Sequence, residues 1–210
     1  MIVGRKIRLR RPECISDHEL IVAWRNAPGS KPFFFGDEPI SLESHLSWYD
    51  GTKTGPGQHY FVIESLVSPA GDTGVGENAL LEKPLPIGTI GLLHIDPRNR
   101  SAEFGRLLVG RPEYRRGGFA REAEFLVMDF AFNYLNLHKV WAEVIVGNEA
   151  ALSLYRKFGF VEEGVLRQQI FKDGRYVNIV RIGLLAEDFH ELEPSLREAT
   201  GLPPRVGHET

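Results

Sequence analysis

A glycine-bearing turn between an apolar run and a long amphipathic segment constrains the fold of this chain more than any other feature. The turn, at residues 114–120, reads Tyr-Arg-Arg-Gly-Gly-Phe-Ala. It follows the strand-like run 102–109 and opens the segment 119–137, whose apolar side chains recur with helical spacing. A helix that begins at such a turn exposes backbone N–H groups at the positive end of its dipole, which favours phosphate. The turn alone is equally compatible with a purely structural role, because it has neither P-loop nor dinucleotide-fingerprint spacing.

Hydrophobic periodicity and turn residues predict the remaining elements. Ser16 and Glu19 have capping-box spacing, and Asp173-Gly174 is typical of a type I′ hairpin. The alternation of strands and helices predicts a mixed α/β sheet with helices on its faces and parallel pairing in the middle. Strands are expected over residues 6–10, 60–64, 87–94, 102–109, 139–146, 165–172 and 175–184, and helices over 16–26, 42–49, 119–137 and 149–158.

The length of 210 residues suits one domain, which we place at residues 1–190. Residues 65–86 contain glycine and proline with little periodicity, so an extended loop insertion is expected there. The polar, proline- and glycine-containing stretch 191–210 is expected to be a flexible tail.

Composition and charge argue against several classes of function. A net charge of -3 gives no overall attraction to nucleic acid, and no apolar run approaches the ~20 residues of a membrane span. The single cysteine, Cys14, has no internal disulfide partner. The N-terminus lacks the apolar region of a signal peptide, so a cytoplasmic location is expected. The seven histidines lack the spacing of metal ligands, and no metal is expected.

Several segments, in the same order, resemble one acyltransferase family. Residues 115–120 (Arg-x-x-Gly-x-Ala) are similar to the pyrophosphate loop of the GNAT N-acetyltransferase superfamily, and residues 148–160 resemble its second conserved segment. Residues 102–105, 137–140 and 164–167 resemble the branch that acetylates ribosomal-protein N-termini and related amines. This resemblance implies the GNAT fold, with a mostly antiparallel mixed sheet, one splayed parallel strand pair and flanking helices.

The same resemblance implies acetyl-CoA as acetyl donor, bound where strands 102–109 and 139–146 splay apart. Backbone groups near residues 107–109 would pair with the pantetheine arm, and those of 115–120 would hold the pyrophosphate. An N–H group at residue 108 or 109 would stabilise the developing oxyanion. The implied cofactor-binding residues are Leu107, Leu108, Val109, Arg115, Arg116, Gly117, Gly118, Phe119, Ala120 and Asn148.

Two residues are candidates for proton transfer. Strand alternation places residues 103, 105, 107 and 109 on one face, so the Glu103 carboxylate is a candidate base for an alkylammonium with a pKa of about 10. An ordinary ion-paired carboxylate is the alternative. The resemblance implies that Tyr155 donates a proton to the leaving thiolate, whereas its helical spacing also suits a packed aromatic ring. Asn148 is expected to cap the helix that carries Tyr155.

The predicted function is acetyl-CoA-dependent transfer to a primary amine by direct attack, without a covalent enzyme intermediate. Residues 24–26 and 41–46 resemble segments of GNAT enzymes that acetylate nucleotide-linked amino sugars, which favours a small amine or such a sugar as acceptor. The acceptor-binding candidates are Trp24, Arg25, Asn26, His45 and His94.

Three other functions remain open, namely a protein N-terminal acetyltransferase, a non-catalytic acyl-CoA-binding module and a protein that binds another nucleotide. Residues 105–108 read Gly-Arg-Leu-Leu where the family commonly has Gly-Tyr-Trp-Leu, which leaves the acceptor open. The oligomeric state is also open, and a homodimer is compatible with the sequence.

Overall fold

A mixed sheet of eight strands forms the centre of the protein in the computed structural model, which describes residues 1–31, 34–53, 57–69 and 79–204. The strands are β1 (Ile2–Val3), β2 (Ile7–Arg10), β3 (His59–Val67), β4 (Leu80–Asp96), β5 (Ser101–Val109), β6 (Lys139–Ile145), β7 (Val161–Lys172) and β8 (Arg175–Leu185). The helices are α1 (Ile15–Asn26), α2 (Leu42–Lys53), α3 (Phe119–Asp129), α4 (Glu149–Lys157) and α5 (Ala186–Thr200). A 3₁₀ turn, Pro112–Tyr114, precedes α3, and a π-helical turn, Phe130–Tyr134, follows it.

One pair of strands in the middle of the sheet is parallel and opens along its length. The strand order is β1-β2-β3-β4-β5-β6-β8-β7, and the described neighbours pair antiparallel except β5 and β6. The parallel register runs from Ser101, opposite Lys139, to Glu103, opposite Trp141, and includes no later residue of either strand. The fold prediction of a mostly antiparallel sheet with one splayed parallel pair is therefore confirmed.

A β-bulge in β5 lies next to the point where β5 and β6 separate. Gly105 is opposite Gly91, and Leu108 is opposite Thr89, so Arg106 and Leu107 face a single residue of β4. Arg106 has a left-handed backbone, with φ of 60°. A bulge reverses side-chain alternation beyond it, so the prediction that residues 103, 105, 107 and 109 share one face was wrong past residue 105.

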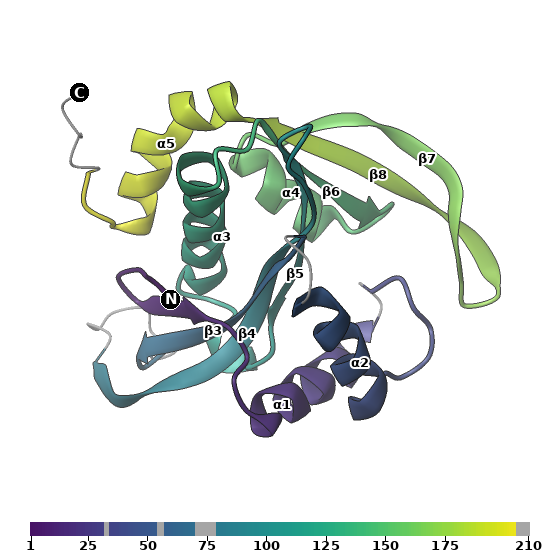
Figure 1. Ribbon diagram of the computed structural model, residues 1–210, viewed down its shortest axis with the longest axis horizontal. Coiled ribbons are helices and arrows are strands. Elements are labelled where there is room, and N and C mark those ends of the chain that lie inside the picture. The colour runs from purple at the N-terminus through teal and green to yellow at the C-terminus, as the bar shows by residue number, and fades with distance from the viewer. Residues whose placement is uncertain (32–33, 54–56, 70–78, 205–210) are drawn as a thin grey trace.

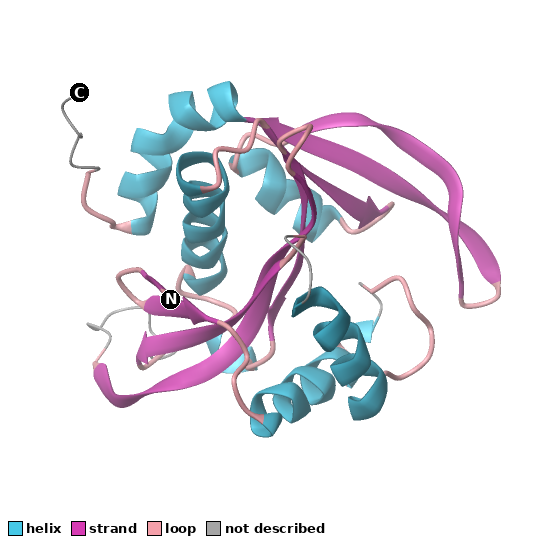
Figure 2. Ribbon diagram, viewed as in Figure 1, coloured by secondary structure: helices cyan, strands magenta, loops and turns pink. Residues whose placement is uncertain are grey.

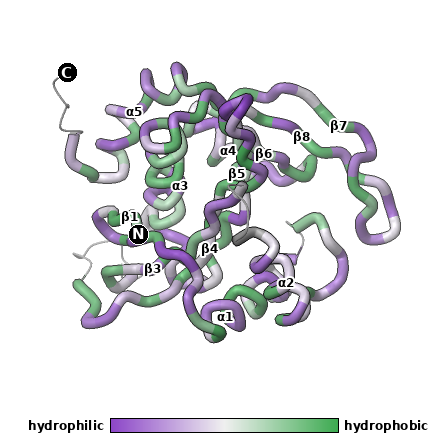
Figure 3. Tube along the Cα trace, viewed as in Figure 1, coloured by the Kyte–Doolittle hydropathy of each residue, from purple (hydrophilic) through white to green (hydrophobic). Residues whose placement is uncertain are grey.

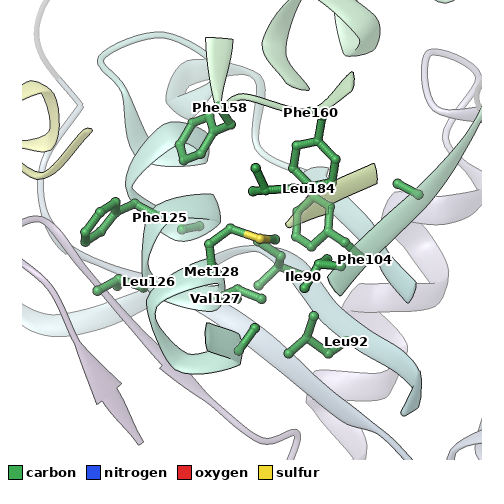
Figure 4. Close-up of a cluster of buried hydrophobic side chains, with 14 of the residues drawn as sticks. Ile90, Leu92, Phe104, Phe125, Leu126, Val127, Met128, Phe158, Phe160 and Leu184 are labelled. Carbon is green, nitrogen blue, oxygen red and sulfur yellow. The ribbon is translucent and has the colours of Figure 1, made fainter. Parts of the chain in front are cut away.

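Helices cover both faces of the sheet, with α3 and α5 on one side and α1 and α2 on the other (Figure 1). Alternate residues of β3 contact the two layers. Phe61 and Ile63 belong to the main core under α3, whereas Tyr60 and Val62 pack with side chains of α1 and α2. Figure 4 shows part of the main core, where the side chains of α3 meet those of β4, β5 and β8 around Phe125, Leu126, Val127, Met128, Ile90, Leu92, Phe104, Phe158, Phe160 and Leu184.

The β7–β8 hairpin projects beyond the helices (Figure 2). Its turn residues Asp173 and Gly174 have φ of 48° and 75°, as a type I′ turn requires, so the hairpin prediction is confirmed. Most side chains of β7 are exposed, and Figure 3 shows hydrophilic residues along much of this strand. At the tip, the ammonium of Lys172 donates to the carbonyl oxygens of Lys31, Phe34 and Gly36 at 3.4, 2.8 and 3.4 Å. The hairpin thereby holds the segment that follows α1.

Two boundaries differ from the sequence predictions because tertiary contacts override local signals. Helix α1 begins after Cys14, and the Asp17 carboxylate, rather than Glu19, accepts from the backbone of Glu13 at 2.9 Å. Arg10 holds that carboxylate at 2.6 and 2.7 Å, and these contacts keep the pKa of Asp17 well below its usual range against the opposing effect of burial. The expected loop over residues 65–86 is partly strand, because β3 continues to Val67 and β4 starts at Leu80; residues 70–78 lie outside the described part of the chain.

The segments after the glycine turn and at the C-terminus also differ from expectation. Regular helix ends at Asp129, although helical spacing predicted a helix over residues 119–137. The wider π turn that follows leaves Tyr134 78% exposed. The predicted tail was wrong up to Thr200, since α5 occupies Ala186–Thr200 and buries Phe189 and Leu196 against the core. Pro194, one of the residues on which the tail prediction depended, lies inside α5. Residues 205–210 lie outside the described part of the chain.

Candidate active site

A cavity of about 510 Å³ lies where β5 and β6 diverge. Strand β5 supplies one wall, and α4 together with the end of β6 supplies the opposite wall. The segment after α1 contributes Phe34 and Phe35, and the glycine turn contributes Arg115 and Ala120. The cavity brings together the following predicted site residues: Glu103, Leu107, Leu108, Val109, Arg115, Ala120, Asn148 and Tyr155.

The glycine turn has the backbone that its sequence predicted. Gly117 and Gly118 both have φ of 83°, which side-chain-bearing residues rarely adopt, and Gly118 is the N-cap of α3. The first N–H groups of a helix have no intrahelical acceptor, and they lie here at the positive end of the dipole. Arg115 adds a guanidinium, which donates to the Val109 carbonyl at 3.3 Å. These groups are suited to bind an anion such as a diphosphate.

The side chains around this turn divide into exposed and buried ones. Arg116 is exposed and does not line the cavity, so it is available only at the rim. Phe119 is 1% exposed and packs edge-on against Tyr114 at 5.1 Å between ring centres. Lys6 donates to the Gly117 carbonyl at 2.9 Å and lies over the Phe119 ring. Phe119 therefore offers only its backbone to a ligand, while its ring anchors the turn.

Asn148 caps α4, as predicted. Its side-chain oxygen accepts from the backbone N–H of Ala151 at 3.2 Å, and Asn148 also lines the cavity. Gly159, with φ of 91°, follows the end of the helix. The cap and the terminating glycine set the start and end of the short helix that presents Tyr155.

Tyr155 lines the cavity while its ring is packed on one side. The ring lies 5.7 Å from that of Phe104, edge-on, and 5.5 Å from that of Phe160. Burial first, and the carboxyl of Glu124 second, raise the pKa of Tyr155 above its ordinary value. The phenol therefore keeps its proton at neutral pH, which is the form needed to donate to a leaving sulfur atom.

Glu124 is a buried carboxyl group that the sequence analysis missed. It lies one helical turn after Ala120 on α3 and is 0% exposed. Neither carboxyl oxygen has a hydrogen-bond partner among the residues the structure describes. Burial raises the pKa of Glu124 well above its ordinary value, and Arg121 only partly opposes this. In the sequence, the signal for this group was a glutamate at helical spacing from the apolar residues Ala120, Val127 and Met128.

We expect Glu124 to make the protein less stable as pH rises. Because its folded pKa is raised, its stabilising contribution is complete below the unfolded pKa of about 4.3 and is lost as pH rises toward the folded pKa. Relative to Glu124→Gln, the wild type should lose up to about 1.4 kcal/mol of unfolding free energy per pH unit in that window. Denaturant unfolding of both proteins from pH 4 to 8 measures the difference, with the exposed Glu198→Gln as control. A difference that is constant with pH would contradict the expectation.

Glu103 and His94 form a pair at the mouth of the splay. The Nδ1 atom of His94 lies 2.7 Å from Oε2 of Glu103. The His94 side chain is 68% exposed, whereas that of Glu103 is 19% exposed. Glu103 is also the last residue of β5 in the parallel register and lines the cavity. The structure thus places two independently predicted residues in direct contact, and an exposed histidine can pass a proton to solvent.

The other acceptor-binding candidates lie behind the cavity or beside it. Trp24 is 9% exposed, and its ring fills the space next to Gly110, where a Cβ would come within 2.2 Å of it. The Asn26 side-chain amide donates to the carbonyl oxygen of Ile40 and accepts from the backbone N–H of Ile40, both at 2.9 Å. His45 is 3% exposed and lies 3.1 Å from Nδ1 of His18. These three side chains shape the helical layer, and the structure brings none of them into the cavity wall.

The electrostatic surroundings of His45 are unfavourable to protonation. Burial first, then the neighbouring His18 and the positive charges of Arg25 and Arg106, lower the pKa of His45 to about 4. His45 is therefore neutral near pH 7 and stacks on Trp48, with 5.7 Å between ring centres. Arg106 and Trp48 also lie close together here, and the sequence analysis did not assign either to the site.

The described ranges contain neither a cluster that could hold a metal ion nor a helix that could span a membrane. Among residues 1–31, 34–53, 57–69 and 79–204, no group of three or more histidine, cysteine, aspartate or glutamate side chains is arranged to hold a metal ion. None of the helices in the same ranges is both long and apolar enough to cross a bilayer.

Comparison with known proteins identifies the family. A model described as an acetyltransferase (GNAT) domain matches residues 6–161. A putative ribosomal N-acetyltransferase, YdaF of Bacillus subtilis, is 30% identical over 171 residues, which cover 81% of this chain and 85% of that protein. The fold and the cavity between splayed strands agree with this match. The chain belongs to the GNAT acetyltransferase family.

Polyamine-acetylating proteins are also among its relatives. The spermidine N(1)-acetyltransferase of Vibrio cholerae is 40% identical over 103 residues, or 49% of this chain, and the match spans only 58% of that relative. A crystal structure of spermidine N-acetyltransferase from Vibrio cholerae, in complex with CoA and spermine, superposes with a TM-score of 0.71 at 29% identity. That superposition covers 88% of this chain and 98% of that one.

Proposed function

We propose that this protein is an acetyl-CoA-dependent N-acetyltransferase that acts on a small primary amine or a nucleotide-linked amino sugar. One observation carries the proposal: Glu103, Tyr155 and Arg115 line the same cavity at the separation of β5 and β6. Family membership and a structural neighbour in complex with CoA support the choice of acetyl donor. The polyamines of the relatives support a small amine as the class of acceptor.

The residues of the cavity have distinct roles in this proposal. Acetyl-CoA, when bound, supplies the thioester whose acetyl group is transferred. Glu103 takes a proton from the acceptor ammonium, directly or through water, and His94 relays it to solvent. The backbone N–H of Leu108 or Val109 stabilises the negative charge that develops on the acetyl oxygen. Tyr155 donates its hydroxyl proton toward the departing sulfur.

Release of the CoA thiol from acetyl-CoA tests the proposal. We expect release above background with at least one small amine in a panel of amino sugars, nucleotide-linked amino sugars, polyamines and peptides with free N-termini. Turnover confined to the peptides would instead favour the protein N-terminal acetyltransferase, which the relationship to YdaF makes the second candidate. Binding of acetyl-CoA by calorimetry without any turnover would favour a regulatory module, and preferential binding of ATP or NAD would overturn the assignment.

A further inference from the structure

Two arginine side chains lie beside the catalytic cavity, each stacked on an aromatic ring. Arg25, in the last turn of α1, has its guanidinium 4.8 Å from the ring centre of Phe34. Arg106, at the bulge of β5, has its guanidinium 5.3 Å from the ring centre of Trp48. Phe34 and Arg106 line the main cavity, and Phe34 and Arg25 line a second cavity of about 50 Å³. Phe34 is thus a wall residue of both cavities.

Neither guanidinium has an anionic partner in the described part of the chain. The Nε atoms of Arg25 and Arg106 are buried and form no hydrogen bond to any described residue, and no ion pair to either side chain is found there. Burial first, and the positive charge of Arg106 second, lower the pKa of Arg25, so the two groups are close enough to repel each other. Both arginine side chains are half-buried, and charged groups with buried atoms are normally paired, because an unpaired buried charge is costly.

The neighbouring carboxylates do not supply the missing negative charge. Glu103 is engaged by His94 at 2.7 Å. Glu143, another residue of the cavity wall, is engaged by Arg181 at 2.7 Å. Glu38 lines the smaller cavity but is exposed and forms no ion pair with the described residues. None of these carboxylates forms an ion pair with Arg25 or Arg106, so both guanidinium groups lack an anionic partner among the described residues.

We propose that the acceptor amine carries an anionic group, a phosphate or a carboxylate, which Arg25 and Arg106 bind while the amine faces Glu103. The proposal rests on the acetyltransferase function and narrows its substrate class. Guanidinium groups match the geometry of both anions through paired N–H donors. The left-handed backbone of Arg106 is a strained conformation of the kind that is retained at functional sites.

The same charges argue against polyamine acceptors. Spermidine carries additional ammonium groups, and each would be repelled by two guanidinium groups that lack a counter-charge. An anionic amine instead gains charge-assisted hydrogen bonds to both arginines. The acceptor preference of this protein is therefore expected to differ from that named for its Vibrio cholerae relatives.

Matched pairs of acceptors test the proposal kinetically. We expect kcat/KM for phosphoethanolamine to exceed that for ethanolamine at least tenfold, or that for glycine to exceed that for glycinamide by the same factor, with spermidine poor. The first pair reports phosphate and the second carboxylate. In Arg25→Gln and Arg106→Gln, KM for the preferred anionic amine should rise at least tenfold, with little change for its neutral partner. The exposed Arg98→Gln is the control. Equal losses for both members of a pair, or a preference for spermidine, would overturn the proposal.

Measuring anion binding directly tests the arginine site independently of the proposed acetyltransferase activity. If no amine is turned over, CoA-saturated protein can be titrated calorimetrically with phosphoethanolamine, glycine and inorganic phosphate. Anion binding that is lost in Arg25→Gln and Arg106→Gln, with CoA affinity retained, would support the arginine site while the acetyltransferase function fails. If none of the three anions binds, or if they bind the variants as well as the wild type, the arginine site is refuted.

Discussion

Replacement of Tyr155 by phenylalanine is expected to lower kcat about 100-fold or more, with little change in the dissociation constant of acetyl-CoA. The substitution removes one hydroxyl group and leaves the ring that packs on Phe104 and Phe160. A proton donor positioned at the leaving group is typically worth 10²- to 10⁴-fold in rate, on the order of 3 to 5 kcal/mol of activation free energy. The raised pKa of Tyr155 keeps the hydroxyl protonated, so its loss should be felt across the neutral pH range.

Three measurements together distinguish this role from simple packing. Steady-state thiol release gives kcat, calorimetry gives the acetyl-CoA affinity, and thermal unfolding shows whether the fold is intact. Tyr134→Phe, which changes a tyrosine that is 78% exposed, serves as the matched control and should behave as wild type. A Tyr155→Phe enzyme with wild-type kcat would restrict Tyr155 to the packed aromatic role that its helical spacing also allows.

The features that the sequence predicted well depend on local signals. The glycine turn, the Asn148 cap and the Asp173-Gly174 hairpin each need a particular backbone conformation or a nearby hydrogen bond, and a few neighbouring residues specify it. Several such signals, in the same order as in the GNAT family, also pointed to that family. The family resemblance in turn implied the splayed strand pair. Local chemistry was therefore sufficient to predict the framework of the cofactor side of the cavity.

The features that could not be predicted from the sequence depend on contacts between distant parts of the chain. The bulge at Arg106 is visible only in the pairing of β4 with β5, and it changes which side chains of β5 face the cavity. The clamp that Lys172 forms on the segment after α1 joins residues more than 130 positions apart. α5 forms despite Pro194 because its apolar residues pack on the core. No window of neighbouring residues contains these interactions.

The arrangement of the acceptor-binding candidates also depends on contacts between distant parts of the chain. Resemblance directed attention to His45 and Asn26, but His45 is buried beside His18, and Asn26 fixes Ile40. That Arg25 and Arg106 have no anionic partner among the described residues is visible only once α1, α2 and β5 are placed together. Of the two, Arg25 was identified from sequence and Arg106 only as a departure from the family pattern.

Glu103→Gln is expected to lower kcat/KM about 100-fold at pH 7, the lower end of the typical contribution of a general base. Glutamine keeps an oxygen that can accept from Nδ1–H of His94, so the pair at 2.7 Å is preserved in shape while the proton acceptor is lost. Only acceptor molecules that arrive already deprotonated can then react. For an ammonium with a pKa of about 10, that fraction rises tenfold per pH unit below the pKa.

The pH dependence of kcat/KM therefore distinguishes a general base from a carboxylate that only positions the acceptor. As pH rises from 7 to 9, kcat/KM of the Glu103→Gln enzyme should increase nearly tenfold per unit, whereas the wild-type value should increase far less, and the two should converge. His94→Gln, which retains the Glu103 carboxylate, should keep the wild-type slope with a smaller loss, because water can replace His94 as the route to solvent. Parallel profiles for the wild type and Glu103→Gln would mean that the carboxylate only positions the acceptor. The base would then have to be sought among solvent molecules in the cavity, because the other carboxylate of its wall, Glu143, is engaged by Arg181.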